Sequence, residues 1–284
     1  MSENFGSPSP TQPLSIGNVV SAAVRLYRSH LKEYFLLALR AYIWLIIPIY
    51  GWAKFYALTA LISRLAFGEL VNQPESISSG ERFVNSRLWQ FLVVILLLFL
   101  VGMGIGLAAL ILFVLLGVLS AALVGGIGQQ GNPATYLLFG LLAFVVGIAA
   151  LVAVLWLVTR FYLVDLPLAV EDNVNGASAI SRSWDLTQGH VWRILLISFV
   201  AFLITVPLQI IVQILTSILQ VLFASVLQQE SGIFTLVFFL LVLALSFSSG
   251  AVIVPFWQTV KAVIYYDLRS RREGLGLKLR DREI

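Results

Sequence analysis

The stretch that decides the fold is residues 88–159, which contain no Asp, Glu, Lys, Arg or His. Its first part, residues 88–124, reads LWQFLVVILLLFLVGMGIGLAALILFVLLGVLSAALV, and its last part, residues 134–159, reads ATYLLFGLLAFVVGIAALVAVLWLVT. About 20 apolar residues suffice for a helix to cross a bilayer. The turn-forming run GGIGQQGNP divides the stretch at residues 125–133. We therefore predict two membrane-crossing helices joined by a short loop.

A second long uncharged stretch, residues 194–229, indicates further membrane crossings. Of the 284 residues, 60% are hydrophobic and only 11% are charged, and the mean hydropathy is +0.96. An average soluble domain has roughly 25% charged residues. The composition excludes an ordinary soluble globular protein. It predicts an all-α polytopic integral membrane helical bundle, with five or six membrane segments and interfacial amphipathic helices.

We expect one membrane domain, residues 14–266, between two polar ends. The expected segments are a disordered lead at 1–13, an amphipathic surface helix at 14–34, a broken or re-entrant segment at 35–67, crossings at about 88–124, 134–159, 191–226 and 234–266, a cytoplasmic connector at 160–190 and a basic cytoplasmic tail at 267–284. The connector is expected to contain a second interfacial helix.

The distribution of Lys and Arg predicts the orientation. The short loops at 125–133 and 227–232 contain neither, whereas the connector and the tail contain several, so we expect both termini in the cytoplasm. A single crossing at 35–67 would place the basic residues before it outside, against the same rule. We therefore favour a hairpin or re-entrant segment broken near Pro48 over five simple spans.

Residue types that bind metals and cofactors, or that couple transport to ions, are rare or absent in this sequence. This limits the functions that we expect of the protein. The chain has no cysteine and only two histidines, so we expect no disulfide, no metal site and no cofactor. None of the four clear crossings contains Asp or Glu. Transporters coupled to protons or cations usually need a carboxylate in the membrane, so this class is disfavoured.

A polar stripe runs along the crossing that follows Pro207. Its members, at helical spacing, are Gln209, Gln213, Thr216, Ser217 and Gln220. Polar side chains at membrane depth do not favour lipid. The stripe therefore predicts either hydrogen bonding between helices, within the protein or to a partner, or a water-lined path or ligand cavity.

Small residues on two crossings predict close helix packing. They include Gly102, Gly106, Gly117, Gly140 and Gly147. Such spacing lets helix backbones approach each other and favours packing within the chain or with a second copy.

Charged and aromatic residues gather in the connector and at its borders. They are Arg160, Asp165, Glu171, Arg182, Trp184, Asp185, Trp192 and Arg193. We expect a charge network that ties the connector to the cytoplasmic ends of the crossings. A catalytic alternative would pair Glu171 or Asp185 with His190 to activate Ser183, but no nucleophile motif surrounds this serine.

Other basic residues favour contact with anionic lipid headgroups. Arg269, Arg271 and Arg272 in the tail are expected to bind such headgroups, and acidic residues between the cations argue against nucleic acid. Arg40 and Lys54 are the charges that a re-entrant segment would carry deepest. They are expected either to extend to the interface or to line a site.

Three strings resemble one known family. They are RFY at 160–162, AISRSWDLTQG at 179–189 and YYDLRSRREG at 265–274. The chain resembles, over residues 14–274, the bacterial integral membrane family named after the membrane domain of glycerophosphoryl diester phosphodiesterases. The resemblance implies no activity here, because catalysis in those enzymes belongs to a separate soluble barrel domain that we do not expect in these residues. The chain departs from the family at Leu275 and Gly276, where an acidic position is usual.

These observations together predict a non-enzymatic protein. We expect a membrane scaffold or accessory subunit that packs against a membrane-protein partner or a second copy, in contact with lipids, in the bacterial inner membrane or, in a photosynthetic host, the thylakoid membrane. The alternative is a transporter or flippase-like carrier of a lipid or amphipathic solute.

Overall fold

The computed structural model describes residues 15–126, 133–227 and 232–274, and helices account for nearly all of them, with no strand in these ranges. The all-α helical fold predicted from the sequence is therefore confirmed. The helices in chain order are α1 (Ile16–Ser29), α2 (Leu31–Trp44), α3 (Tyr50–Leu70), α4 (Ile77–Ser86), α5 (Leu88–Gly126), α6 (Pro133–Arg160), α7 (Asp165–Val170), α8 (Gly176–Thr187), α9 (Val191–Leu227) and α10 (Gly232–Glu273).

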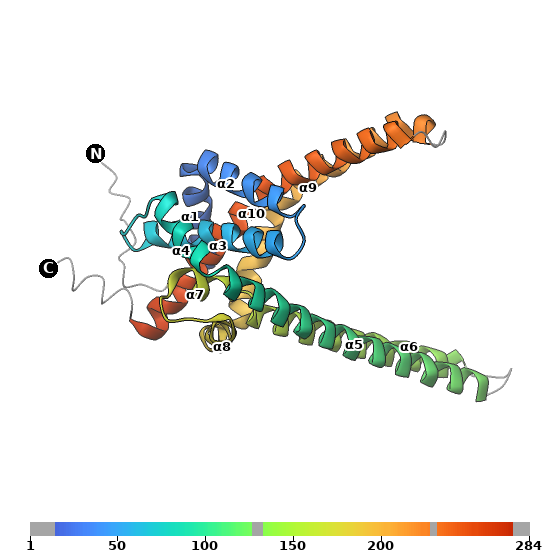
Figure 1. Cartoon of the computed structure of the whole chain (residues 1–284). Helices are drawn as coiled ribbons and strands as arrows, with labels where there is room; N and C mark the ends of the chain where they lie inside the picture. The colour runs from blue at the N-terminus through green and yellow to red at the C-terminus, as the bar shows by residue number, and fades with distance from the viewer. Residues whose placement is uncertain (1–14, 127–132, 228–231, 275–284) are drawn as a thin grey trace, which may run out of the picture.

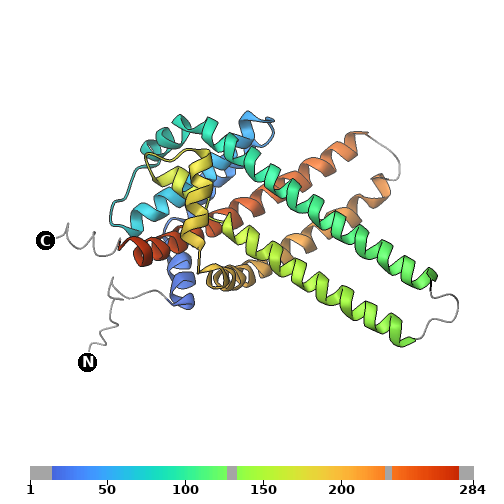
Figure 2. The ribbon, with the colours of Figure 1, turned by 90° about the horizontal axis from the view of Figure 1, so that it is seen from below.

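Two long helical hairpins extend from a compact base and diverge from each other (Figure 1). One hairpin is α5 with α6, and the other is α9 with α10; a view from below shows the same arrangement (Figure 2). Among the described residues, four helices are long and apolar enough to cross a membrane, one in each arm of the two hairpins. The protein is thus a multi-pass membrane protein. The far parts of the hairpins expose large side chains such as Phe113, Leu137 and Val221, as a lipid environment requires.

The base is built around α3. Its side chains Leu58, Leu61 and Ile62 have no accessible surface, because α2, α4, α7 and α10 all pack on this helix. Polar side chains set several helix starts: Ser15 caps α1, Ser76 caps α4, and Asn175 forms a capping box with Ser178 at α8. The short helices therefore begin where local side-chain hydrogen bonds replace the missing intrahelical ones.

The first amphipathic segment differs from the expected single helix at 14–34. It breaks at His30 into α1 and α2. The apolar face of α1, with Val19, Val20 and Ala23, is buried against α9 and α10. The partner of this face is therefore protein, and the polar face of the helix remains outside.

The segment expected to be broken near Pro48 is a helical hairpin. Helix α2 ends at Trp44, a turn follows, and α3 begins at Tyr50. Neither α2 nor α3 is among the four candidate spans, so the membrane crossings that length and composition support number four in the described part of the chain, not five or six. The tail also begins later than expected, because α10 continues through the predicted boundary at residue 266 to Glu273.

Candidate functional site

The base contains a polar cluster where the connector between the two long hairpins meets α10. Its centre is Glu171, which follows α7. The Tyr265 hydroxyl donates to Glu171 Oε1 over 2.5 Å, and Arg182 Nε lies 3.1 Å from the same oxygen. Arg182 also pairs with Glu273, whose other oxygen lies 2.9 Å from Arg269 Nε. The ends of α7, α8 and α10 are therefore joined through one continuous network.

Two carboxylates hold cations along this face of α10. Asp165, fully buried, accepts from Lys261 Nζ over 2.9 Å, and its Oδ1 has no hydrogen-bond partner within the described ranges. Asp267, also buried, lies 3.1 Å from Arg193 Nη2 and 3.0 Å from Arg271 Nε. Two of these three pairs link α10 to another element, since Asp165 opens α7 and Arg193 belongs to α9, whereas Asp267–Arg271 lies within α10.

Arg160 shows how the network meets the membrane ends of the helices. Its guanidinium carbon lies 4.7 Å from the Trp156 ring centre and 4.8 Å from that of Trp184, so cation–π attraction holds it from two sides. It also donates to the Trp184 carbonyl over 3.1 Å, while Ser183 Oγ donates to the Arg160 carbonyl over 2.7 Å. The cation at the end of α6 is therefore fixed to α8.

A second cluster joins α3, α4 and the loop after α7. Arg64 Nε lies 2.6 Å from Glu75 Oε2 and its Nη1 donates to the Ala169 carbonyl over 2.6 Å. Arg87 donates to the carbonyls of Leu168 and Glu171, at 3.2 Å and 2.6 Å. Two arginines thus fix the loop that presents Glu171.

Charge pairing outweighs burial in shifting these pKa values. Burial opposes ionisation of Glu75, but hydrogen bonds from Arg64 and Ser79 and the charge of Arg64 hold its pKa below the ordinary value. Burial likewise lowers the pKa of Arg182, yet the carboxylates of Glu171 and Glu273 raise it above the ordinary value. Pairing therefore favours the charged forms of Glu75 and Arg182, and these ion pairs hold together the elements that they join.

The catalytic alternative is not assembled in the described residues. Ser183 is fully buried and its hydroxyl is used by the Arg160 carbonyl. His190 contacts the Gln188 carbonyl over 3.1 Å, and Asp185 is exposed without an ion pair in this part of the chain. Among the described residues, neither His190, Asp185 nor Glu171 forms a hydrogen bond with the serine, so the pairing that the catalytic alternative requires is not formed there. The exposed Trp192 ring, 62% accessible, lies at the start of α9.

The polar stripe of α9 faces away from the rest of the chain. Gln209 Nε2 donates to Thr205 Oγ1 over 3.1 Å. The hydroxyls of Thr216 and Ser217 donate to carbonyls one turn earlier in their own helix. In contrast, Gln213 and Gln220 are exposed, and their amides make no hydrogen bond with any described residue. An open, shallow hollow of about 370 Å³ adjoins the stripe, lined by Gln213, Ile214, Ser217, Ile218, Val221 and Leu222.

The predicted packing glycines lie beside open space in the part of the chain that the structure describes. A Cβ atom added at Gly102, Gly106, Gly117, Gly140 or Gly147 would meet nothing within 4 Å. Close approach occurs instead at Gly250, where a Cβ would overlap the Tyr42 ring, and at Gly176, where it would lie 3.0 Å from the Gln90 carbonyl oxygen. These glycine faces are therefore open in the described part of the chain, and close packing through them stays a prediction.

The three tail arginines are already engaged inside the protein. Arg269 pairs with Glu273, Arg271 with Asp267, and Arg272 donates to the Gln188 carbonyl over 2.5 Å. The exposed cations without an ion pair among the described residues include Arg25 and Arg28, both on α1. The arginines in the last turns of α10 therefore bind groups of the protein itself. Of the three, only Arg271 and Arg272 are also exposed and able to contact lipid headgroups.

A comparison with protein-family models finds one match, to the membrane domain of glycerophosphoryl diester phosphodiesterase, over residues 134–272. Residues 134–272 are therefore similar to this family. The resemblance predicted from the sequence is thereby confirmed for the part from α6 to α10. This region contains Glu171, Arg182, Tyr265 and Arg269, so the polar cluster lies inside the family's match except for Glu273. Searches of curated proteins and of solved structures found no match.

Proposed function

We propose that the protein is a non-enzymatic membrane scaffold or accessory subunit, which assembles through the exposed faces of its two long hairpins. The observation that carries this proposal is that the exposed amides of Gln213 and Gln220, on a mostly apolar helix, make no hydrogen bond with the described residues. In hydrocarbon an amide has no water to bond, so a polar stripe is stabilised when another helix covers it. Interhelical hydrogen bonds contribute roughly 0.6 kcal/mol each on average.

The open glycine faces support the same proposal. Gly102 and Gly106 on α5, with Gly140 and Gly147 on α6, leave room for a second backbone. Small residues at this spacing let membrane helices approach closely. Both hairpins therefore offer a surface suited to a helix of a partner or of a second copy.

The alternative function is carriage of a lipid or amphipathic solute. The open hollow along α9 beside Gln213 and Ser217 supports it, because its largely apolar lining suits an acyl chain. Both proposals therefore depend on the same polar stripe, and replacing its two exposed amides distinguishes between them.

The positions of the basic residues support a location and an orientation in the membrane. Every Lys and Arg in the described ranges lies in the base or at the ends of the hairpin arms next to it. The positive-inside rule then favours a base on the cytoplasmic side of the bacterial inner membrane, with both termini in the cytoplasm.

The decisive variant replaces both amides, Gln213→Leu with Gln220→Leu. Its matched control is Ser246→Ala on α10, whose hydroxyl donates only to the Val242 carbonyl of its own helix. After mild extraction from native membranes, the double variant should lose a protein partner or its oligomeric state, while the control keeps it. Loss of solute or lipid flux in reconstituted vesicles, with unchanged assembly, would support the carrier and overturn the scaffold.

A further inference from the structure

The turn between α2 and α3 exposes a cluster of large apolar side chains at its tip. The most exposed are Ile46, at 67%, and Ile49, at 60%. The other members are Ile43, Ile47, Tyr50 and Trp52. Turns that face water are normally rich in Gly, Asn, Asp and Ser, whereas contiguous exposed apolar surface marks contact with protein or membrane.

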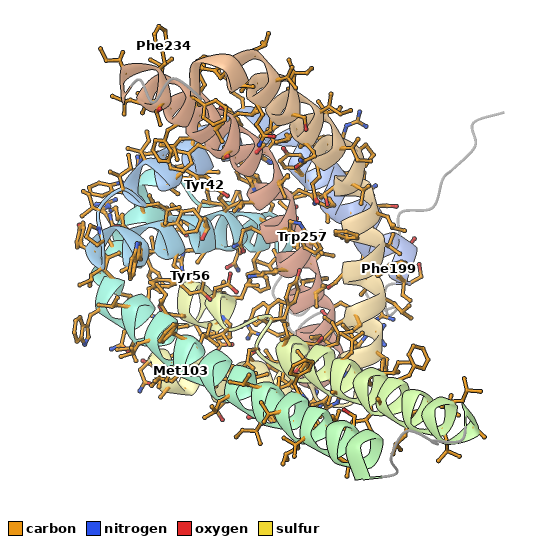
Figure 3. All side chains as sticks on the ribbon, turned by 90° about the vertical axis from the view of Figure 1, so that its right-hand side faces the viewer. Tyr42, Tyr56, Met103, Phe199, Phe234 and Trp257 are labelled. Carbon is orange, nitrogen blue, oxygen red and sulfur yellow. The ribbon has the colours of Figure 1, made fainter. Side chains whose placement is uncertain are left out.

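We propose that this tip enters the hydrocarbon of one leaflet, so that α2 and α3 form a re-entrant hairpin between the two membrane hairpins. The occupant of the apolar surface is thus the acyl chains of lipids. Figure 1 shows the turn directed to the same side as the far ends of both long hairpins. Figure 3, seen from that side, places Tyr42 of α2 and Tyr56 of α3 between α9–α10 and α5.

Charges define the boundary of the inserted part. Residues 41–53 contain no charged side chain. The flanking cations, Arg40 and Lys54, both pair with Glu81 of α4, and Lys54 Nζ also donates to Asn85 Oδ1 over 2.6 Å. Both cations are therefore held at the base, and the half-exposed Arg40 guanidinium lies at the level expected for lipid headgroups.

The depth of the tip fits one leaflet. From Arg40 to the turn, a helical rise of 1.5 Å per residue gives about 10 Å. Half of the hydrocarbon core is about 15 Å. The tip therefore reaches into the near leaflet and stops before the bilayer centre.

Four backbone amides at the turn donate to carbonyls of the turn or of the adjoining end of α2. The amides of Leu45, Ile46 and Ile47 donate to the carbonyls of Tyr42, Ile43 and Trp44, at 3.0, 3.4 and 3.0 Å. Tyr50 N donates to the Pro48 carbonyl over 2.8 Å, and proline itself has no amide proton. Each backbone group that is paired in this way lowers the cost of bringing the turn into hydrocarbon, where an unsatisfied group has no water to bond.

The turn also keeps a strained geometry. Ile49 has a φ of 62°, which is unfavourable for a β-branched residue. Gly51 is required beside it, because a Cβ there would overlap the Trp44 carbonyl oxygen. The tight turn thus brings the two helix ends together while its isoleucines point outward.

The native chain lacks cysteine, so single-cysteine variants test this proposal directly. Nitroxide labels at Ile47→Cys and Ile49→Cys are compared in phosphatidylcholine–phosphatidylglycerol vesicles with Ser78→Cys, an exposed residue of α4, and Ile211→Cys, an exposed residue of the membrane part of α9. Electron paramagnetic resonance then measures collision with oxygen and with a water-soluble nickel complex.

The proposal expects the oxygen-to-nickel collision ratio at both tip positions to exceed that of Ser78→Cys several-fold and to lie below that of Ile211→Cys. A ratio equal to that of Ser78→Cys would place the tip in water and overturn the proposal. Low collision with both reagents would show a protein cover and overturn it too. Loss of the proposed partner or oligomer would not change the oxygen-to-nickel collision ratio at the tip. The test is therefore independent of the proposed scaffold function.

Discussion

Tyr265 of α10 donates a 2.5 Å hydrogen bond to Glu171, although 94 residues separate them. This contact joins the connector between the two hairpins to the last helix. The same carboxylate accepts from Arg182 of α8, so three elements depend on one residue. The base can therefore hold two diverging hairpins without extensive packing between the hairpins themselves.

Tyr265→Phe should destabilise the protein by about 1.5–3 kcal/mol, because a hydrogen bond to a charged acceptor is lost. The measurement is thermal unfolding of the purified protein in detergent. Tyr266→Phe is the matched control, since the Tyr266 hydroxyl makes no hydrogen bond with residues that the structure describes. Equal melting temperatures for the two variants would contradict the assigned role of Tyr265.

Lys261→Met should cost about 3–5 kcal/mol, because it leaves the buried carboxylate of Asp165 without its cation. The double variant, Lys261→Met with Asp165→Leu, should recover most of this loss, since it removes both buried charges. Unfolding in detergent measures both. Additive losses in the double variant would show that the two residues do not act as a pair.

Gly250→Ala should destabilise the isolated protein by about 1–3 kcal/mol, because the new methyl group overlaps the Tyr42 ring. Gly102→Ala provides the contrast: its Cβ meets open space in this chain. That variant should leave unfolding unchanged and weaken only assembly. A loss of stability at Gly102 in the isolated chain would instead place this glycine at an internal helix contact.

Stability should fall at acidic pH through Glu75 and Glu81. Both have pKa values held below the ordinary 4.5, since the cations Arg64 and Arg40, respectively, outweigh the opposing effect of burial. A lowered folded-state pKa stabilises the protein above the unfolded value and loses this contribution as pH falls through the folded value. Melting temperature should therefore stay level from neutral pH down to about 5 and fall below about 4.5.

Glu75→Gln tests the source of this acid sensitivity. The variant should melt lower at neutral pH and show a shallower fall below about 4.5, because one of the two titrating carboxylates is gone. A Glu33→Gln control removes an exposed carboxylate without an ion pair among the described residues. If this control flattened the curve as much as Glu75→Gln does, the ion pair with Arg64 would not be the cause.

The sequence predicted the long helices because uncharged length alone decides them. The stretch at 88–159 and its turn formers are visible without any partner, and the break at Pro48 follows from the missing amide of proline. The positions of the hairpins relative to the base could not be predicted from the sequence. Spacing shows which residues share a helix face, but it does not show which other element covers that face.

The partners of the polar side chains come from distant elements that spacing along the sequence does not identify. Lys54 was recognised as a deep charge, yet its partners Glu81 and Asn85 come from α4, far along the chain. Glycine spacing indicated Gly102 and Gly147, whereas the close contact occurs at Gly250, which no repeat marks. Long-range pairing depends on the directions of the helices, and no local pattern encodes these.

The central claim, assembly through the exposed faces of the hairpins, is tested most directly by the composition of the particle extracted from native membranes. Mild detergent extraction of the tagged full chain, size exclusion and mass spectrometry would identify every protein and lipid that remains bound. The account predicts a stoichiometric membrane-protein partner or a defined homo-oligomer that depends on Gln213 and Gln220. A monomer that retains a single lipid class, with or without these glutamines, would contradict it.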